Sequence, residues 1–304
     1  MNPFFVEKIV RGGDVMENKI TGNTRLAALF ATPIRHSVSP IIHNTAFQAL
    51  GIDAVYLAFE VGPDGLEQAI ASIRNLDMLG ANLSMPNKLL AVNHMDKLSE
   101  AARLIGAINT ITNQDGFLVG HNTDGIGFMR SLHDMNVTII GHKMTVLGAG
   151  GAAAAIIAQA ALDGVKEIAV YNRNSRSYEQ AKAKLRYIAE QTNCRITLND
   201  LADEKALAQD VGESRLLLNT TSVGMKPLEK ATPIQDFSII GPDLVVYDAI
   251  YTPRETAFLK QARLRGALTA NGLGMLLYQG AEAFKLWTGQ ELPISIVKPI
   301  IEKN

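Results

Sequence analysis

The sequence predicts an α/β protein with two α/β domains, the second of which is a Rossmann domain that binds a dinucleotide. Apolar stretches of strand length alternate with helical patterns along most of the chain, as in sheets flanked by helices. A G-x-G-x-x-A fingerprint, Gly148 to Ala153, joins one such strand to a long Ala/Ile helix. The fingerprint lies in mid-chain, and 304 residues suffice for two cores, so the residues before it are expected to form their own domain.

The composition narrows the class of protein and its partners. With 47% hydrophobic and 19% charged residues, the chain is expected to be soluble and globular, and a net charge of −1 offers no basic surface for nucleic acid or membrane. The single Cys194 excludes an internal disulfide and suits a reducing, cytoplasmic environment. No apolar stretch is long enough to cross a bilayer, and residues 1–24 are expected to be an N-terminal extension rather than a signal peptide.

The residues before the fingerprint predict a β-α-β-α-β unit. Strands are expected at 26–30, 54–59 and 81–84, and helices at 40–50 and 66–76. Ser39 precedes Pro40 at the expected helix start, so its structural interpretation is an N-cap. Ser37 caps nothing obvious and is available to bind a ligand.

Two charged residues of this half have competing interpretations. Lys88 follows the third strand at the expected mouth of a cleft, before a helix at 89–95, where a cation opposes the helix dipole. It is either a functional residue or a solvated surface lysine. Asp124 follows Thr123, the expected N-cap of a helix that runs to about residue 136, so it either starts that helix or has a functional role. A helix at 99–105 and a hairpin around Asp115-Gly116 lie between them.

The second half of the sequence alternates regularly between expected strands and expected helices. Strands are expected at 144–147, 168–171, 195–198, 216–219, 245–248 and 268–270, with helices at 178–191, 204–211, 256–265, 274–288 and 294–301. The irregular stretch 226–242 is expected at the mouth of the cofactor site. The predicted division is a first domain at 25–122 joined by the C-terminal helices 274–304, a linking helix at 123–136, and a Rossmann domain at 137–273.

Each small residue of the fingerprint has a physical role. Gly148 permits the tight strand-to-helix turn, Gly150 lets the backbone approach a pyrophosphate, and Ala153 lets helix and sheet pack closely. The identity of the dinucleotide stays open. The second strand ends in Tyr171 to Arg176 without the acid that holds a ribose 2′-hydroxyl, and Arg173 with Arg176 suits the 2′-phosphate of NADP. Arg173 also suits stacking on the adenine of either NADP or NAD.

Six ordered motifs together resemble the shikimate dehydrogenase family, including its quinate/shikimate branch, from about residue 26 to the C-terminal helices. They are Ser37–Asn44, Asn82–Lys88, Gly106–Thr110, Asn122–Asp124, Gly148–Ala152 and Gly272–Gln279. The resemblance implies reversible hydride transfer between nicotinamide and C3 of shikimate, an N-terminal substrate-binding domain, and Lys88 with Asp124 as the catalytic pair. Oxidation of a secondary alcohol needs a base for the hydroxyl proton, although Lys88 acting only as a fixed cation is the alternative.

The resemblance also implies two sets of contacts. Those to the substrate are Ser37, Ser39, Ser84, Lys88, Asn109, Asp124, Tyr251 and Gln279. Those to the cofactor are Gly148, Ala149, Gly150, Gly151, Ala152, Asn172, Arg173, Arg176, Thr221, Ser222, Ala249, Ile250, Tyr251 and Gly272. Ser84 stands where the family more often has Thr, which fits the quinate/shikimate branch and suggests some use of quinate. Ser175 stands where that branch, whose members can use NAD, often has Asp.

Other functions and properties remain open at this point. The histidines show no metal-ligand spacing, so no metal is expected. The protein is expected to be a monomer or homodimer. A two-domain dehydrogenase acting on another substrate, such as a folate, would explain the fingerprint but not the pair Ser37 and Ser39. A nucleotide-sensing regulator without activity would be expected to lack Lys88 or Asp124, and both are present.

Overall fold

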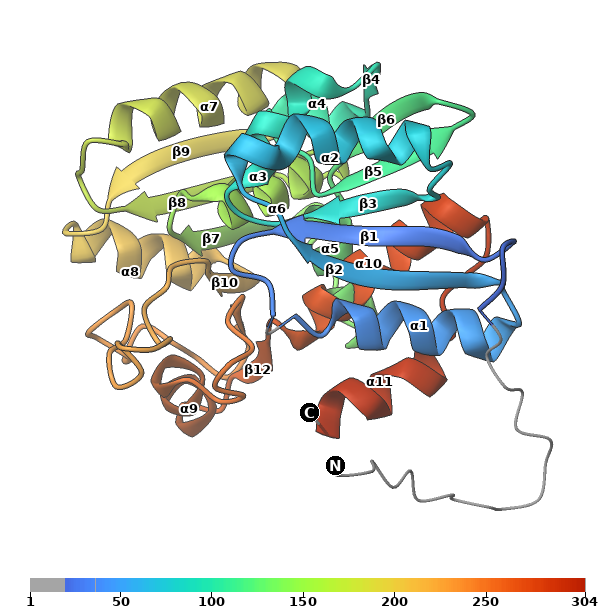
Figure 1. The fold of residues 1–304 in the computed structure, drawn as a ribbon. Helices are drawn as coiled ribbons and strands as arrows, with labels where there is room; N and C mark the ends of the chain where they lie inside the picture. Colours follow the sequence, from blue (N-terminus) through green and yellow to red (C-terminus); the bar gives the residue numbers. More distant parts are fainter. Residues whose placement is uncertain (1–19, 36, 304) are drawn as a thin grey trace, which may run out of the picture.

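The protein contains two six-stranded sheets that lie side by side, each with helices packed on it (Figure 1). The computed structural model describes residues 20–35 and 37–303. The predicted extension at 1–24 therefore falls largely outside the described residues. The predicted α/β class with two parallel-rich sheets is confirmed.

The first sheet has the strand order β2-β1-β3-β5-β6-β4. Its strands are β1 (Arg25–Ala31), β2 (Ala54–Glu60), β3 (Gly80–Leu83), β4 (Lys97–Leu98), β5 (Thr110–Gln114) and β6 (Phe117–His121). β1 pairs in parallel with β2 and β3, as predicted, but β5 joins β3 antiparallel, so the sheet is mixed. The predicted hairpin is present, with Asp115 and Gly116 at positive φ in its turn.

The helices of this half correct two predictions. They are α1 (Ser39–Leu50), α2 (Pro63–Asn75), α3 (Asn87–Leu90), the 3₁₀ helix Ala91–His94, and α4 (Glu100–Ile105). The expected helix at 89–95 is therefore split, with its first half starting two residues earlier. Ser39 is not the N-cap of α1: Val38 occupies that position, and the Ser39 N–H donates to Ser37 Oγ at 3.2 Å. Ser37 thus does satisfy a helix-terminal donor.

The second sheet is parallel throughout and has the strand order β12-β11-β10-β7-β8-β9. Its strands are β7 (Lys143–Leu147), β8 (Glu167–Asn172), β9 (Arg195–Asp200), β10 (Leu216–Asn219), β11 (Val245–Asp248) and β12 (Leu268–Asn271). Its helices are α6 (Gly151–Leu162), α7 (Tyr178–Gln191), α8 (Glu204–Glu213) and α9 (Ala257–Leu264). The chain progresses outward in both directions from β7, so the loop after β7 lies at the switch point where ligands bind in such sheets.

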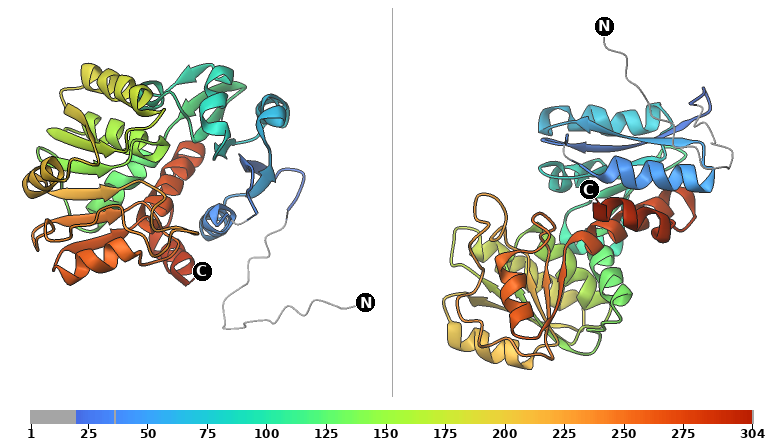
Figure 2. Two further views of the ribbon diagram at one scale, coloured as in Figure 1. Left: turned by 90° about the vertical axis from the view of Figure 1, so that its left-hand side faces the viewer. Right: turned by 90° about the horizontal axis from the view of Figure 1, so that it is seen from below.

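Two helices connect the sheets. α5 (Asp124–Asp134) follows β6, and α10 (Leu273–Thr288) follows β12, and the two pack against each other between the sheets (Figure 2). α11 (Ile294–Lys303) then packs on α1 of the first sheet. We propose that the domain boundaries follow this arrangement, with 25–122 and 274–304 in one domain, 137–273 in the other, and α5 as the link.

The crossing of α5 and α10 depends on Gly127. A Cβ at this position would lie 2.5 Å from the backbone nitrogen of Gln279 and 2.7 Å from the carbonyl oxygen of Met275. Gly127→Ala is therefore expected to lower the free energy of unfolding by about 1–3 kcal/mol, measured by urea denaturation. Gly212→Ala in α8 is the matched control, because nothing lies within 4 Å of its Cβ position. That variant should be as stable as the parent or more so, and an equal loss in both variants would contradict the prediction.

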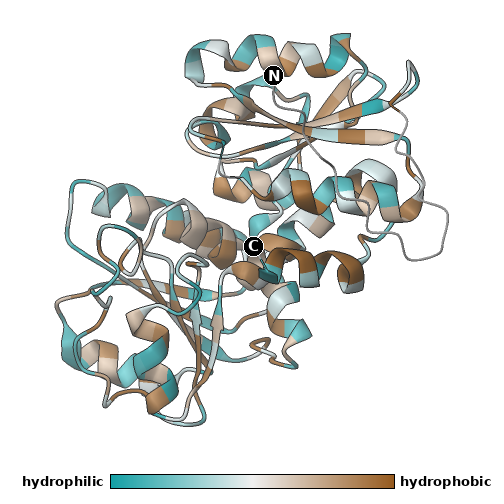
Figure 3. Ribbon diagram, turned by 60° about the horizontal axis from the view of Figure 1, so that its bottom comes forward, coloured by the Kyte–Doolittle hydropathy of each residue, from teal (hydrophilic) through white to brown (hydrophobic). Residues whose placement is uncertain are grey.

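Hydrophobic residues concentrate in the strands and in the helix faces against them, whereas the outer loops are mostly hydrophilic (Figure 3). On one face of the second sheet α6 and α7 bury an apolar cluster, and on the other face α8 and α9 bury a second. None of the helices that the structure describes combines the length and apolar character needed to cross a membrane.

Candidate active site

A cavity of about 230 Å³ lies between the two sheets, at the carboxyl ends of β1 and β3 and beside the chain that leaves β11 and β12. All eight side chains predicted to contact substrate line it: Ser37, Ser39, Ser84, Lys88, Asn109, Asp124, Tyr251 and Gln279. Ala249 and Gly272, which were predicted to contact the cofactor, line the same cavity. The structure therefore brings residues from both halves of the chain to one place.

Lys88 and Asp124 form an ion pair in the wall of this cavity. Lys88 Nζ donates to Asp124 Oδ2 at 2.5 Å, and the two side chains are 24% and 14% exposed. Lys88 comes from α3 and Asp124 from the first turn of α5, where its carboxylate is favoured by the helix dipole. Because the pair is half-buried yet reaches the cavity, both groups are available to a bound hydroxyl.

Asn109 holds Asp124 from the side opposite Lys88. Its Nδ2 donates to Asp124 Oδ1 at 2.7 Å and approaches Gln279 Oε1 at 3.4 Å. Its Oδ1 accepts the backbone N–H of Thr123 at 2.8 Å. Thr123 occupies the N-cap position of α5, as predicted, but its hydroxyl bonds Asn109 and makes no capping hydrogen bond to the helix. Each carboxylate oxygen of Asp124 thus has its own partner.

The remaining polar side chains of the cavity are hydroxyl and amide groups. Gln279 on α10 donates from Nε2 to the carbonyl oxygen of Leu276 at 2.9 Å, which holds its side chain near Asn109. Tyr251 is 37% exposed on the chain that follows β11. Such groups suit a ligand that carries several hydroxyls.

The fingerprint loop lies between β7 and α6, as predicted. Gly148 has φ +102°, and a Cβ there would approach Thr220 Oγ1 to 2.7 Å, so only glycine fits this turn. Nothing lies within 4 Å of the Cβ positions of Gly150 and Gly151. This open space, next to the free N–H groups at the start of α6, fits the pyrophosphate of a dinucleotide.

A buried carboxylate, that of Asp248, holds the chain in place on the other side of the fingerprint loop. Asp248, at the end of β11, accepts hydrogen bonds from Asn219 Nδ2 at 3.0 Å, from the Thr256 hydroxyl at 2.7 Å and from the Ile250 N–H at 3.1 Å. Burial raises the pKa of Asp248 to about 6. Asn219 in turn accepts the N–H and the hydroxyl of Thr221. These bonds fix the segments that carry Thr221, Ser222, Ala249, Ile250 and Tyr251.

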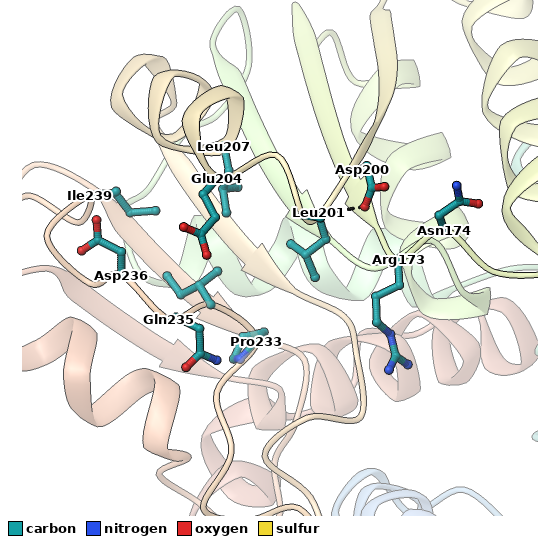
Figure 4. Close-up of a pocket in the computed structure, with 12 residues that line it drawn as sticks. Arg173, Asn174, Asp200, Leu201, Glu204, Leu207, Pro233, Gln235, Asp236 and Ile239 are labelled. Carbon is teal, nitrogen blue, oxygen red and sulfur yellow. Dashed lines mark hydrogen bonds between the residues drawn. The ribbon is translucent and has the colours of Figure 1, made fainter.

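A second cavity, of about 440 Å³, lies beside Arg173 (Figure 4). Arg173 and Asn174 follow β8 on one side of it, and residues 233–236 of the predicted mouth loop line the other. Asp200, which pairs in register with Asn172, also lines it. Arg176 is not among the lining residues. The structure therefore places Arg173 and the 226–242 loop together, at the edge of the fingerprint sheet.

Comparisons with known proteins agree with this geometry. Residues 29–111 match the family described as "Shikimate dehydrogenase substrate binding domain", and residues 272–301 match "Shikimate 5'-dehydrogenase C-terminal domain". A shikimate dehydrogenase (NADP(+)) of Listeria innocua is 49% identical over 283 residues, which cover 93% of this chain and 97% of that protein. The chain belongs to the shikimate dehydrogenase family.

Solved structures of the shikimate dehydrogenase family have the same fold. The shikimate 5-dehydrogenase of Listeria monocytogenes, solved with shikimate and NAD, superposes with a TM-score of 0.91 at 48% identity and covers 93% of this chain and 98% of its own. A shikimate dehydrogenase solved with NADP+ has a TM-score of 0.85 at 38% identity and covers 94% of this chain and 97% of its own. The predicted fold class and family are thus confirmed.

Sequence reasoning missed several polar residues of this chain that lie under the cavity. Asn82 lines the cavity, and Tyr56 and Thr110 connect to it through hydrogen bonds. A signal was present, because Asn82 interrupts an otherwise apolar strand that is buried on both faces. A polar side chain in such a strand needs buried hydrogen-bond partners. Among the residues that the structure describes, no group of three His, Cys, Asp or Glu side chains is arranged to hold a metal ion.

Proposed function

We propose that this protein is a shikimate dehydrogenase that transfers a hydride reversibly between C3 of shikimate and NADP, giving 3-dehydroshikimate. The observation that carries the proposal is the Lys88–Asp124 pair in the wall of a cavity that Gly272 and Ala249 close on the cofactor side. The Listeria monocytogenes relative, which has this fold, binds shikimate and NAD.

Lys88 and Asp124 are proposed to handle the proton of the reaction. The nicotinamide, when bound, supplies or accepts the hydride. As the C3 hydroxyl of shikimate becomes a carbonyl, the pair takes the hydroxyl proton, and in the reverse direction it returns a proton to the forming alkoxide. The 2.5 Å contact between Lys88 Nζ and Asp124 Oδ2 supports this role, since a hydroxyl at either atom lies within reach of both.

Recognition of shikimate is assigned to the remaining polar side chains of the cavity. Three hydroxyls and a carboxylate on the substrate require several donors and acceptors, and the cavity offers three serine hydroxyls, a tyrosine and three amides. The proposed contacts are Ser37, Ser39, Ser84, Asn109, Tyr251 and Gln279. Ser84, smaller than the Thr common in the family, leaves room for the additional hydroxyl of quinate, and we propose quinate as a slower second substrate.

NADP is proposed as the preferred cofactor. The Listeria innocua relative is named for NADP+, and the chain that leaves β8 carries Arg173 and Arg176 without an acid between them. Gly148–Ala152 is proposed to hold the pyrophosphate and Gly272 to lie at the nicotinamide, with Asn172, Thr221, Ser222 and Ile250 around the nucleotide. A bound NAD in the Listeria monocytogenes relative is the reason to test both cofactors.

Arg176→Ala separates the two cofactors. If Arg176 binds the 2′-phosphate, the variant is expected to raise KM for NADP about tenfold and to leave KM for NAD unchanged, because NAD lacks that phosphate. Steady-state kinetics with each cofactor at saturating shikimate measures both constants. Arg186→Ala, which removes an exposed arginine on α7, is the control. An equal effect of Arg176→Ala on NAD and NADP would refute the assignment.

The activity itself is tested by mixing the purified protein with shikimate or quinate and with NADP or NAD, and following the absorbance of reduced nicotinamide. Turnover of shikimate supports the proposal. A dehydrogenase of a different substrate, such as a folate, would show no turnover of either acid, and a nucleotide-sensing regulator would bind the cofactor without reducing it. We further propose a cytoplasmic monomer or homodimer, which light scattering of the purified protein distinguishes.

A further inference from the structure

We propose that Tyr56, Asn82 and Thr110 form a buried chain of hydrogen bonds that positions Asp124 through Asn109. This inference rests on the proposed function, because it concerns the reacting end of the same cavity. None of the three is a predicted contact of substrate or cofactor. They act through Asn109 and are therefore positioning residues.

This chain of hydrogen bonds follows from the register of the first sheet. β2 and β3 flank β1, where Ala27, the partner of Tyr56, is small and leaves room for the phenol ring to extend toward β3. On the other side, Asn82 of β3 is paired directly with Thr110 of β5. Side chains that are neighbours across strands in this way interact directly.

A backbone carbonyl fixes the orientation of the Asn82 amide. Asn82 Nδ2 donates to the carbonyl oxygen of Asn109 at 3.2 Å, and a carbonyl can only accept. Oδ1 therefore faces Tyr56, whose hydroxyl donates to it at 2.8 Å. Asn82 Nδ2 also donates to Thr110 Oγ1 at 3.0 Å, so the Thr110 hydroxyl proton is directed onward.

A backbone N–H fixes Asn109 in the same way. The Thr123 N–H can only donate, and it reaches Asn109 Oδ1 at 2.8 Å. The Thr110 hydroxyl donates to the same Oδ1 at 3.0 Å. Nδ2 of Asn109 is thereby turned toward Asp124 Oδ1, 2.7 Å away, which leaves Oδ2 for Lys88. Donation runs in one direction from Tyr56 to Asp124.

Burial makes this direction rigid. Tyr56 and Thr110 have no exposed surface, and Asn109 is 2% exposed. If the side-chain amide of Asn82 or Asn109 were rotated by 180°, donors would face donors and acceptors would face acceptors, with no water to replace the lost hydrogen bonds. The chain thus holds the Asp124 carboxylate in one orientation in the cavity wall.

Thr110→Val tests the chain, because valine keeps the shape and removes the hydroxyl. The measurement is the first turnover with shikimate and cofactor in excess over enzyme, in which the burst amplitude reports the fraction of competent enzyme and the burst rate reports the chemical step. The expected result is an unchanged amplitude with a rate about tenfold lower, as for the loss of one positioning hydrogen bond. Tyr56→Phe, which removes the first donor, is expected to slow the same step by a smaller factor.

Two variants complete the experiment. Thr110→Ser keeps the hydroxyl and is expected to restore most of the rate. Thr112→Val is the matched control, since Thr112 is buried on the same face of β5 but bonds His121 instead. The proposal is overturned if Thr110→Val lowers the amplitude without changing the rate, which is a purely structural effect, or if it matches Thr112→Val. No turnover by the parent enzyme would instead overturn the proposed function, and the chain's role with it.

Discussion

Replacement of Lys88 by alanine is expected to lower kcat for shikimate oxidation by about three orders of magnitude and to leave cofactor affinity nearly unchanged. Among the residues that the structure describes, Lys88 is the only basic side chain that lines the cavity, and its ammonium lies 2.5 Å from Asp124. Without Lys88, the proton of the substrate hydroxyl has no acceptor that a neighbouring cation supports. An oxyanion that develops on the substrate has no positive charge beside it. Steady-state kinetics and fluorescence titration with NADPH measure the two quantities.

Two further substitutions make this prediction specific. Lys88→Arg keeps the positive charge but binds its proton too tightly to exchange it, so it separates proton transfer from fixed charge. Proton transfer by Lys88 predicts that arginine is almost as damaging as alanine, and a fixed cation predicts substantial recovery. Lys97→Ala, at an exposed lysine of β4, is the control. Turnover of Lys88→Ala within a few-fold of the parent would show that the catalytic assignment is wrong.

Local sequence patterns were sufficient for most elements of the fold because each pattern reports a local cause. The strand 216–219 and the helix 178–191 were predicted with their observed ends, since apolar runs and amphipathic spacing mark buried faces directly. The antiparallel attachment of β5 to β3 was not predicted. Its cause is a long-range pairing, Asn82 against Thr110, that no local pattern contains.

The active site likewise contains features that the sequence predicted and features that only the folded structure shows. The resemblance to the family supplied the eight side chains that line the cavity, and position at the end of a parallel strand independently marked Lys88 among them. The capping role expected for Ser39 was wrong, because α1 begins one residue earlier than expected and Val38 occupies the N-cap position. Thr123 makes no capping bond, because its hydroxyl bonds Asn109, which lies far away in sequence. A hydroxyl at a helix start has several possible partners, and only the folded chain selects among them.

The second large effect is expected from His43, a residue outside the cavity. Its ring, on α1, has no exposed surface, and both ring nitrogens lack a hydrogen-bond partner among the described residues. It stacks on Tyr56 with ring centroids 4.4 Å apart and lies 5.2 Å from Trp287. Burial among these rings lowers the pKa of His43 from 6.5 to about 3. The folded protein therefore keeps His43 neutral at a pH where the unfolded chain protonates it.

This difference makes the folded state sensitive to acid. Below pH 6.5 the unfolded chain binds a proton that folded His43 does not, so the stability from neutral His43, complete above pH 6.5, is lost as the pH falls toward 3. Each pH unit costs about 1.4 kcal/mol, so His43→Phe is expected to lose about 3 kcal/mol less than the parent between pH 6.5 and pH 4. Urea denaturation across this pH range measures the free energy of unfolding of both proteins.

The comparison must be made as a difference between the two proteins, because Asp248 acts in the opposite direction. Its pKa is raised from 3.8 to about 6, so the folded protein binds the extra proton there, and stability from Asp248 increases as the pH falls through that range. In the parent, the contributions of His43 and Asp248 to the pH dependence of stability partly cancel. A free energy of unfolding that changes little with pH would therefore conceal both contributions. In His43→Phe the Asp248 contribution is no longer offset by that of His43, so the stability of this variant should fall less than that of the parent as the pH falls from 6 to 4. Burial also lowers the pKa of His121, which both proteins retain, and its contribution cancels in the difference. His142→Gln, at an exposed histidine, is the control, and its free energy of unfolding should change with pH as that of the parent does. Parallel pH profiles for His43→Phe and the parent would contradict the prediction.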